Sequence, residues 1–122
     1  GYNNTEILVD KMKEAAYKYS SGPDTTTAYY AARLCDVLEY EVDGEVFTDW
    51  FLPSKNELNL MYENLYGQGL VSFADTNYWS SSEISALYAW IQVFTSGGQY
   101  SGGQYSSDRG YVDYRVRPVR AF

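Results

Sequence analysis

Residues 78–95 read YWSSSEISALYAWIQVFT, and this stretch decides the class of the fold. Its first four residues and residues 89–95 predict two β-strands, the second because its side chains alternate with a period of two. In the second strand, Trp90 and Phe94 lie on one face and are bulky enough to anchor a core. A strand that buries one face needs other elements to pack against it.

Those elements are predicted upstream, where the apolar residues recur at helical spacing. Helices are expected from about residue 7 to 19 and from about residue 24 to 38. A third helix is expected to begin at Ser54, because Ser54 and Glu57 have the spacing of a capping box. Helices followed by strands predict an α+β fold rather than an alternating α/β fold.

Downstream of the second strand the sequence is less regular. The pentapeptide GGQYS occurs twice in a row, at 97–101 and 102–106, and is expected to form a glycine-rich loop. Residues 111–119 form a third extended run, in which Pro118 favours a sheet edge or a strand end. The chain is expected to be one domain, residues 1–122, from the C-terminal part of a longer protein.

The composition excludes several classes of function. The chain of 122 residues has no His, one Cys and a net charge of −7. Without His there is no Ser-His-Asp triad and no His-ligated zinc, and a single Cys leaves no internal disulfide. We therefore expect no enzyme and no cofactor or metal. The negative net charge disfavours a nucleic-acid partner. The chain also has no stretch of roughly 18 consecutive apolar residues, so insertion into a membrane is not expected.

Three local features have structural explanations. Six acids without an intervening base lie between residues 36 and 49 and lack EF-hand spacing, so a solvated loop is favoured over a calcium site. Cys35 lies on an apolar helix face and is expected to be a buried thiol. Two of the three C-terminal arginines are expected to pair with the acidic first half rather than to bind nucleic acid; the three are Arg115, Arg117 and Arg120.

Residues 80–114 have the composition of a binding surface. These 35 residues include five Tyr, eight Ser, five Gly and only four charged residues. Tyr offers a large amphipathic contact, and Ser and Gly allow it to be presented. With Trp90 and Phe94 in the core, Ile91 and Val93 are expected to point outward beside several Tyr as an interaction patch. The alternative is a surface loop without a partner.

Four motifs, in order, resemble one protein family, a bacterial branch of the C-type-lectin fold that is also related to formylglycine-generating enzymes. They are DWFLPS at 49–54 followed by Glu57-Leu58, YWSSSE at 78–83, Ala89-Trp90 with Phe94 and Gly97, and VRPVRAF at 116–122. Members include the C-terminal domain of a Legionella collagen-like adhesin, gut-bacterial surface proteins and the variable proteins of diversity-generating retroelements. The resemblance covers residues 25–122 and implies that the last strands and loops carry the ligand surface.

In the retroelement subset, mutagenesis of adenines lets AAY codons become most residue types, but never Gln, Glu, Lys, Met or Trp. The resemblance therefore implies a variable region of about residues 80–115 with some fixed positions. The fixed scaffold residues would be Glu83, Trp90, Gln92, Gln99 and Gln104. The residues eligible for ligand contact would be Ile84, Leu87, Tyr88, Ile91, Val93, Tyr100, Ser101, Tyr105, Ser106, Ser107, Arg109, Tyr111, Asp113 and Tyr114.

The chain departs from better-known relatives in three respects. None of its three prolines lies in the Glu-Pro-Asn or Gln-Pro-Asp motif of calcium-dependent lectins, so a calcium-bridged sugar is not expected. The lone Cys35 does not supply the reactive cysteines of formylglycine-generating enzymes. A pI near 4.4 and a second half without lysine disfavour the sulfated polysaccharides that the adhesin resemblance suggests.

The resemblance and the composition together predict a non-catalytic receptor or adhesin domain whose diversified surface binds varied ligands. Protein ligands are expected, because a Tyr-rich outward patch suits protein epitopes, and glycans are the other option. A constant carbohydrate-binding or attachment module of the same fold is the alternative function. The expected location is a bacterial surface, as a lipoprotein or pilus tip, or else the tip of a phage tail fibre.

Overall fold

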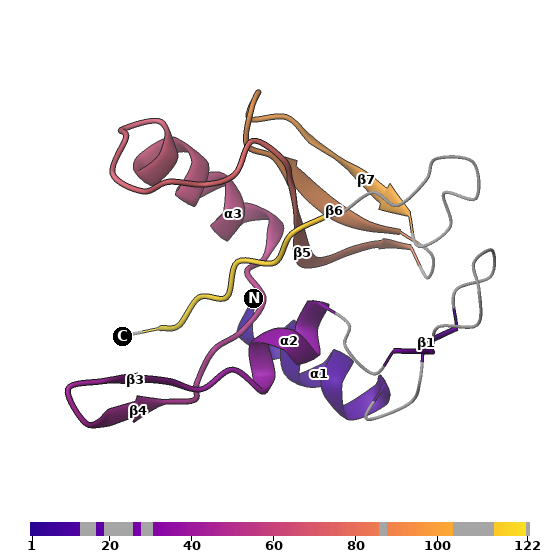
Figure 1. Cartoon of the computed structure of the whole chain (residues 1–122). Coiled ribbons are helices and arrows are strands. Elements are labelled where there is room, and N and C mark those ends of the chain that lie inside the picture. The colour runs from indigo at the N-terminus through magenta and orange to yellow at the C-terminus, as the bar shows by residue number, and fades with distance from the viewer. Residues whose placement is uncertain (13–16, 19–25, 28–30, 86–87, 104–113, 122) are drawn as a thin grey trace.

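The computed structural model describes residues 1–12, 17–18, 26–27, 31–85, 88–103 and 114–121, and it has an α+β fold (Figure 1). Helices α1 and α2 lie together on one side of the molecule, while α3 lies beside a three-stranded sheet. The helical elements are α1 (Tyr2–Met12), α2 (Ala31–Asp36), α3 (Lys55–Met61) and the π-helical turn η1 (Tyr62–Tyr66). The strands are β1 (Tyr17–Lys18), β2 (Thr26–Thr27), β3 (Tyr40–Val42), β4 (Glu45–Phe47), β5 (Asn77–Ser85), β6 (Tyr88–Val93) and β7 (Gln99–Gly103).

The first two helices are shorter than the sequence predicts. Helix α1 begins at Tyr2 and ends at Met12, and α2 covers only Ala31–Asp36. Between them, β1 and β2 pair antiparallel within the two stretches that were predicted to be helical. The prediction was wrong there because Tyr and Thr favour extended backbone, and tertiary pairing overrides a weak helical period.

Helix α3 begins where the capping box predicts. The Ser54 hydroxyl accepts a hydrogen bond from the Glu57 amide at 3.2 Å, and the Glu57 carboxylate accepts one from the Ser54 amide at 2.6 Å. Burial raises the pKa of Glu57, but the hydrogen bonds from Ser54 and the nearby N-terminal ammonium together lower the pKa below its usual value. The confirmed cap fixes the start of the helix that covers one face of the sheet.

The sheet has the order β5-β6-β7, with both pairs antiparallel. The predicted strands at 78–81 and 89–95 are confirmed, although β6 ends at Val93. The expected glycine-rich loop was wrong for its first half: Gly97 turns the chain at a φ of 74°, and β7 follows directly. A strand needs only backbone groups to pair, so Gly and Ser did not prevent it. Within the extended run 111–119, residues 111–113 lie outside the described part, and Arg115 and Val119 form single bridges to Tyr78 and Phe51.

Two apolar clusters hold these elements together. Leu58 of α3 packs with Phe73, Tyr78 and Phe94, and the Phe73 and Phe94 rings stack with centroids 4.3 Å apart. The second cluster joins Ala32 and Cys35 of α2 to Leu52, with Trp79 packed against it. Cys35 is fully buried, as predicted, and burial raises the pKa of its thiol to about 12.

The expected exposure of Ile91 was wrong, since only 3% of this residue is accessible. Ile91 is the register partner of Trp79, so the two side chains share a face of the sheet. Trp79 packs against the second cluster, and this face is therefore not a free solvent face. Phe94 is buried as expected, whereas Trp90 and Val93 are only half-buried. Alternation of side chains identifies the two faces of a strand, but it does not show that either face is exposed to solvent.

The acidic run forms a β-hairpin instead of the expected loop. Strands β3 and β4 pair from Tyr40↔Phe47 to Val42↔Glu45. Asp43 and Gly44, with φ values of 51° and 82°, form the two-residue turn between them. Positive φ at both central residues is the geometry that Asp-Gly favours in hairpins.

Among the described residues, one of the C-terminal arginines pairs with the acidic first half, where two were expected. Arg120 binds Asp49 through Nε to Oδ1 at 2.8 Å and through Nη2 to Oδ2 at 3.1 Å. Arg117 instead donates to the Ser72 carbonyl at 3.4 Å and lies over the Phe73 ring. Both contacts tie the C-terminal segment to the body of the domain.

Candidate functional site

The candidate site is the region around the ends of β5 and β6 and along β7. Three of the eligible residues described there are exposed: Ile84 by 42%, Tyr88 by 46% and Tyr100 by 57%. The polar Glu83 and Ser85 beside Ile84 are exposed as well. An exposed aromatic or β-branched side chain between small and polar neighbours is accessible to a ligand.

The two exposed tyrosines do not share one face of the sheet. Tyr88 lies two residues from Trp90 on β6 and therefore projects on the side of Trp90. Tyr100 pairs with Ile91 across the β6–β7 ladder and projects on the opposite side. The expected single patch of Ile91, Val93, Tyr88 and Tyr100 was wrong, because Tyr88 projects on the opposite side of the sheet from the other three and Ile91 is buried.

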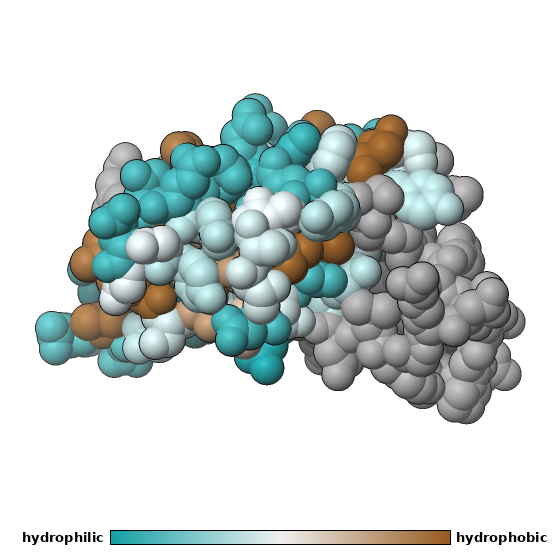
Figure 2. Space-filling view, turned by 90° about the horizontal axis from the view of Figure 1, so that it is seen from above, coloured by the Kyte–Doolittle hydropathy of each residue, from teal (hydrophilic) through white to brown (hydrophobic). Residues whose placement is uncertain are grey.

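Seen from the side of α3 and the sheet, the described surface is mostly polar or of intermediate hydropathy (Figure 2). The strongly apolar side chains form separate small patches there instead of one continuous face. A surface of this kind suits recognition through Tyr and small polar groups more than burial in a permanent apolar interface.

Two glutamine side chains hold the sheet in place, one at the turn between β6 and β7 and one at the contact with α3. Gln92 is fully buried, and its amide donates to the Gly97 carbonyl at 2.8 Å, which holds the turn between β6 and β7. The Gln99 amide donates to the Lys55 carbonyl at 2.7 Å and so joins β7 to the first turn of α3. Lys55 also lies over Trp90, with its ammonium 3.4 Å from the ring centroid. Side chains of β6 and β7 therefore hold the sheet against α3.

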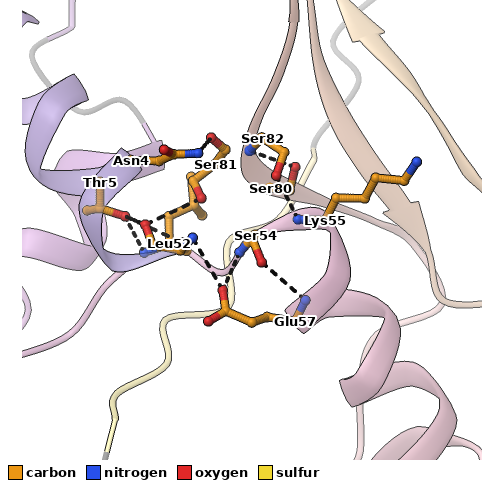
Figure 3. Close-up of polar contacts among 10 residues, drawn as sticks. Asn4, Thr5, Leu52, Ser54, Lys55, Glu57, Ser80, Ser81 and Ser82 are labelled. Atoms are coloured by element: carbon orange, nitrogen blue, oxygen red, sulfur yellow. Dashed lines mark hydrogen bonds and ion pairs between the residues drawn. The ribbon is translucent and has the colours of Figure 1, made fainter.

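The serine triplet 80–82 fixes the other edge of the site (Figure 3). The β5–β6 register shifts between Trp79 and Glu83, so the triplet bulges from the ladder. Ser82 accepts the Lys55 amide at 3.0 Å, and the Ser81 amide donates to the Pro53 carbonyl at 2.8 Å. These contacts satisfy the Lys55 amide at the start of α3 and the Pro53 carbonyl just before it, and the sequence motif does not predict either contact.

The same bulge also holds helix α1. The Asn4 side-chain amide donates to the Ser81 carbonyl at 2.8 Å. The neighbouring Thr5 hydroxyl accepts the Leu52 amide at 3.0 Å. Figure 3 shows these contacts meeting at the junction of α1, the segment before α3 and β5. The N-terminal helix is thus part of the support for the candidate surface.

The remaining eligible residues divide into three groups. Tyr114 is half-buried, and its ring lies edge-on to Trp79 with centroids 4.8 Å apart, so it contributes to packing. Ser101 is described only in its backbone, which pairs with Trp90. Seven predicted residues lie outside the described part of the chain, namely Leu87, Tyr105, Ser106, Ser107, Arg109, Tyr111 and Asp113.

Within the described ranges, no group of three or more His, Cys, Asp or Glu side chains is arranged to hold a metal ion. The raised pKa of the buried Cys35 keeps its thiol protonated at neutral pH, so it is no nucleophile. None of the helices in the described part is both long and apolar enough to span a membrane. Exposed contact area in the described part of the candidate site comes from Tyr88, Tyr100 and Ile84.

No protein-family model matches the chain. The comparison with curated proteins also found no match.

Proposed function

We propose that the chain is a non-catalytic ligand-binding domain of the C-type-lectin type, whose surface within residues 80–115 is diversified to bind varied ligands, chiefly proteins. The observation that supports the proposal is a division among the described residues: those that the codon rule fixes are structural, and those that it allows to vary are exposed. Gln92 and Gln99, which the codon rule fixes, hold the core and the contact with α3. Ile84, Tyr88 and Tyr100, which the rule allows to vary, are exposed.

The division has three exceptions, and they reduce the number of residues in the proposed surface. Tyr114 is eligible by residue type but packs edge-on to Trp79, so it belongs to the scaffold. Ile91 is eligible by residue type but buried, so it belongs to the scaffold. Glu83 is a fixed type but exposed, so it is a constant part of the surface. The described part of the proposed surface is then Glu83, Ile84, Tyr88 and Tyr100, with Tyr88 and Tyr100 on opposite sides of the sheet.

Such a domain works where ligands are met, and we propose the bacterial surface, on a lipoprotein or pilus tip. A phage tail-fibre tip would require the same surface. Exchange of a few exposed side chains alters what the surface binds, while the buried residues keep the fold unchanged.

A constant carbohydrate-binding module is the second candidate. The exposed rings of Tyr88 and Tyr100 favour it, since aromatic faces stack on sugar rings. Their positions on opposite sides of the sheet would give two separate contacts rather than one groove.

The test is the DNA of the gene and its neighbourhood. Diversification requires a near-copy of the 3′ end with AAY codons at Ile84, Tyr88 and Tyr100, together with a gene for a reverse transcriptase. Identical codons at these three positions in many isolates, with no such copy, would reject diversification. If the chain then bound glycans on an array, and Tyr88→Ala abolished that binding, the result would support the constant carbohydrate-binding module.

A further inference from the structure

The β3–β4 hairpin carries large apolar side chains that nothing in the described structure covers. Tyr40, Val42 and Val46 are exposed by 59%, 45% and 53%. The register places Tyr40 and Val42 on one face together with Phe47, a surface that we call the hairpin face. Among the described residues, β3 and β4 pair only with each other. Isolated two-stranded hairpins are marginally stable in water, so this one is a good candidate for completion by a partner.

The hairpin lies away from the proposed ligand surface. In Figure 1 it projects from the body on the side of the C-terminus, while the ends of β5 and β6 lie on the opposite side of the view. A partner bound to the hairpin would therefore leave the ligand surface free. This inference does not depend on the proposed function.

The charge of the hairpin selects the chemistry of the partner. Glu41, Asp43 and Glu45 are all exposed, and no Lys or Arg occurs between Arg33 and Lys55. A second copy that laid its hairpin against this one would bring like charges together, which destabilises the pairing. A partner with arginine or lysine beside apolar side chains would match both the carboxylates and the hairpin face.

The base of the hairpin already shows this type of contact within the chain. The Arg120 guanidinium binds the Asp49 carboxylate and lies 4.0 Å from the centroid of the Phe47 ring. The Trp50 indole donates to the Phe47 carbonyl at 3.0 Å and fixes the same end. Arginine is well suited to such a site, because its planar group stacks on a ring while it binds a carboxylate. On the same face, Tyr40 offers a second ring directly across from Phe47, and Glu45 offers a carboxylate farther along; no cation of the described residues contacts either one.

We propose that the β3–β4 hairpin is a docking arm for a partner protein, and that its hairpin face receives a basic segment in which arginine alternates with apolar residues. Arginine side chains of the segment would bind the exposed carboxylates, and its apolar side chains would cover Tyr40 and Val42. The hairpin would then attach the domain to its assembly.

The proposal is tested with an eight-residue peptide of alternating arginine and valine, titrated into the ¹⁵N-labelled chain. Saturable shifts are expected at the amides of residues 39–47. A peptide of alternating arginine and serine should bind at least tenfold more weakly, and one of alternating glutamate and valine should cause no shift. Equal binding of the valine and serine peptides, or shifts spread over other acidic surface, would overturn the proposal.

Two pairs of variants locate the site. Tyr40→Ser with Val42→Ser should weaken binding of the arginine–valine peptide at least tenfold. Leu60→Ser with Leu70→Ser removes two apolar residues that are exposed by 57% and 71% elsewhere, and it should leave binding unchanged. Equal effects of the two pairs would reject the hairpin as the site.

A charge variant keeps the test valid if the first pair alters the hairpin itself. Glu45→Gln retains the shape of the glutamate side chain that pairs with Val42 on the hairpin face, and it should weaken binding several-fold, with a smaller dependence on salt. Unchanged affinity and salt dependence in this variant would contradict the proposed role of the carboxylates.

Discussion

Truncation of Ile91 should be far more costly than truncation of its neighbour across the ladder, Tyr100. The two residues are register partners, but Ile91 is 3% exposed and Tyr100 is 57% exposed. Ile91→Ala removes about three carbon groups at about 0.8 kcal/mol each and leaves a cavity, so the expected loss is about 2–4 kcal/mol. Tyr100→Ser removes only a cross-strand contact, so it should lose less than about 1 kcal/mol.

Urea unfolding followed by circular dichroism measures both losses, provided that the dependence of stability on urea is unchanged. Ile91→Val gives an intermediate point, expected at about 1 kcal/mol. A loss below about 1 kcal/mol for Ile91→Ala would refute the assignment of this residue to the scaffold. It would return Ile91 to the set of residues that are free to vary.

Four further outcomes are expected. Ser54→Ala and Ser82→Ala should each lower the free energy of unfolding by about 1 kcal/mol, because each leaves an amide at the start of α3 without its acceptor; chemical denaturation measures this. The hydrogen bond from Arg120 lowers the pKa of Asp49. The pair should therefore stabilise the fold above the unfolded pKa of roughly 4, and this stabilisation should be lost as the pH falls through the lower folded pKa. Arg120→Gln should remove this part of the acid dependence, which thermal melts at several pH values measure. Cys35 should react with a thiol reagent at pH 8 only when the chain is unfolded, and rapid labelling of the folded chain would contradict its burial. Thermal midpoints with calcium and with chelator should coincide, whereas a large rise with calcium would reveal a site that the lectin motifs do not predict.

Local chemistry was the part of the fold that could be predicted. The cap of α3 depends on Ser54 and Glu57, three residues apart, and the structure has both of its hydrogen bonds. The hairpin at Asp43-Gly44 was equally local, but it was missed because the acids around the turn were interpreted as a solvated loop. An Asp-Gly pair between alternating apolar residues would have been sufficient to predict it.

The site was harder to predict because it depends on contacts between distant residues. Ser82 reaches Lys55 across 27 positions, and Asn4 reaches Ser81 across 77. Periodicity identified the two faces of β6, but the environment of each face is set by Trp79 and the second cluster, which lie elsewhere in the chain. The alternation places Gln92 between Trp90 and Phe94 on the core face of β6, but it does not indicate the hydrogen bond from its amide to the Gly97 carbonyl.

The serine triplet explains where the scaffold ends and the variable surface could begin. Ser82 accepts the Lys55 amide with its hydroxyl, so a change of this side chain disturbs the start of α3, whereas Ser81 is held to Pro53 by its backbone amide. From Glu83 onward β5 is exposed, and Ile84 is the first eligible residue. Because the bulge sets the register of β5 on β6, the strands beyond it are held at their base, and Ile84 and Tyr88 near their ends are exposed. Exchange of residues at those ends would then alter the surface without loosening the contacts that hold the sheet to α1 and α3.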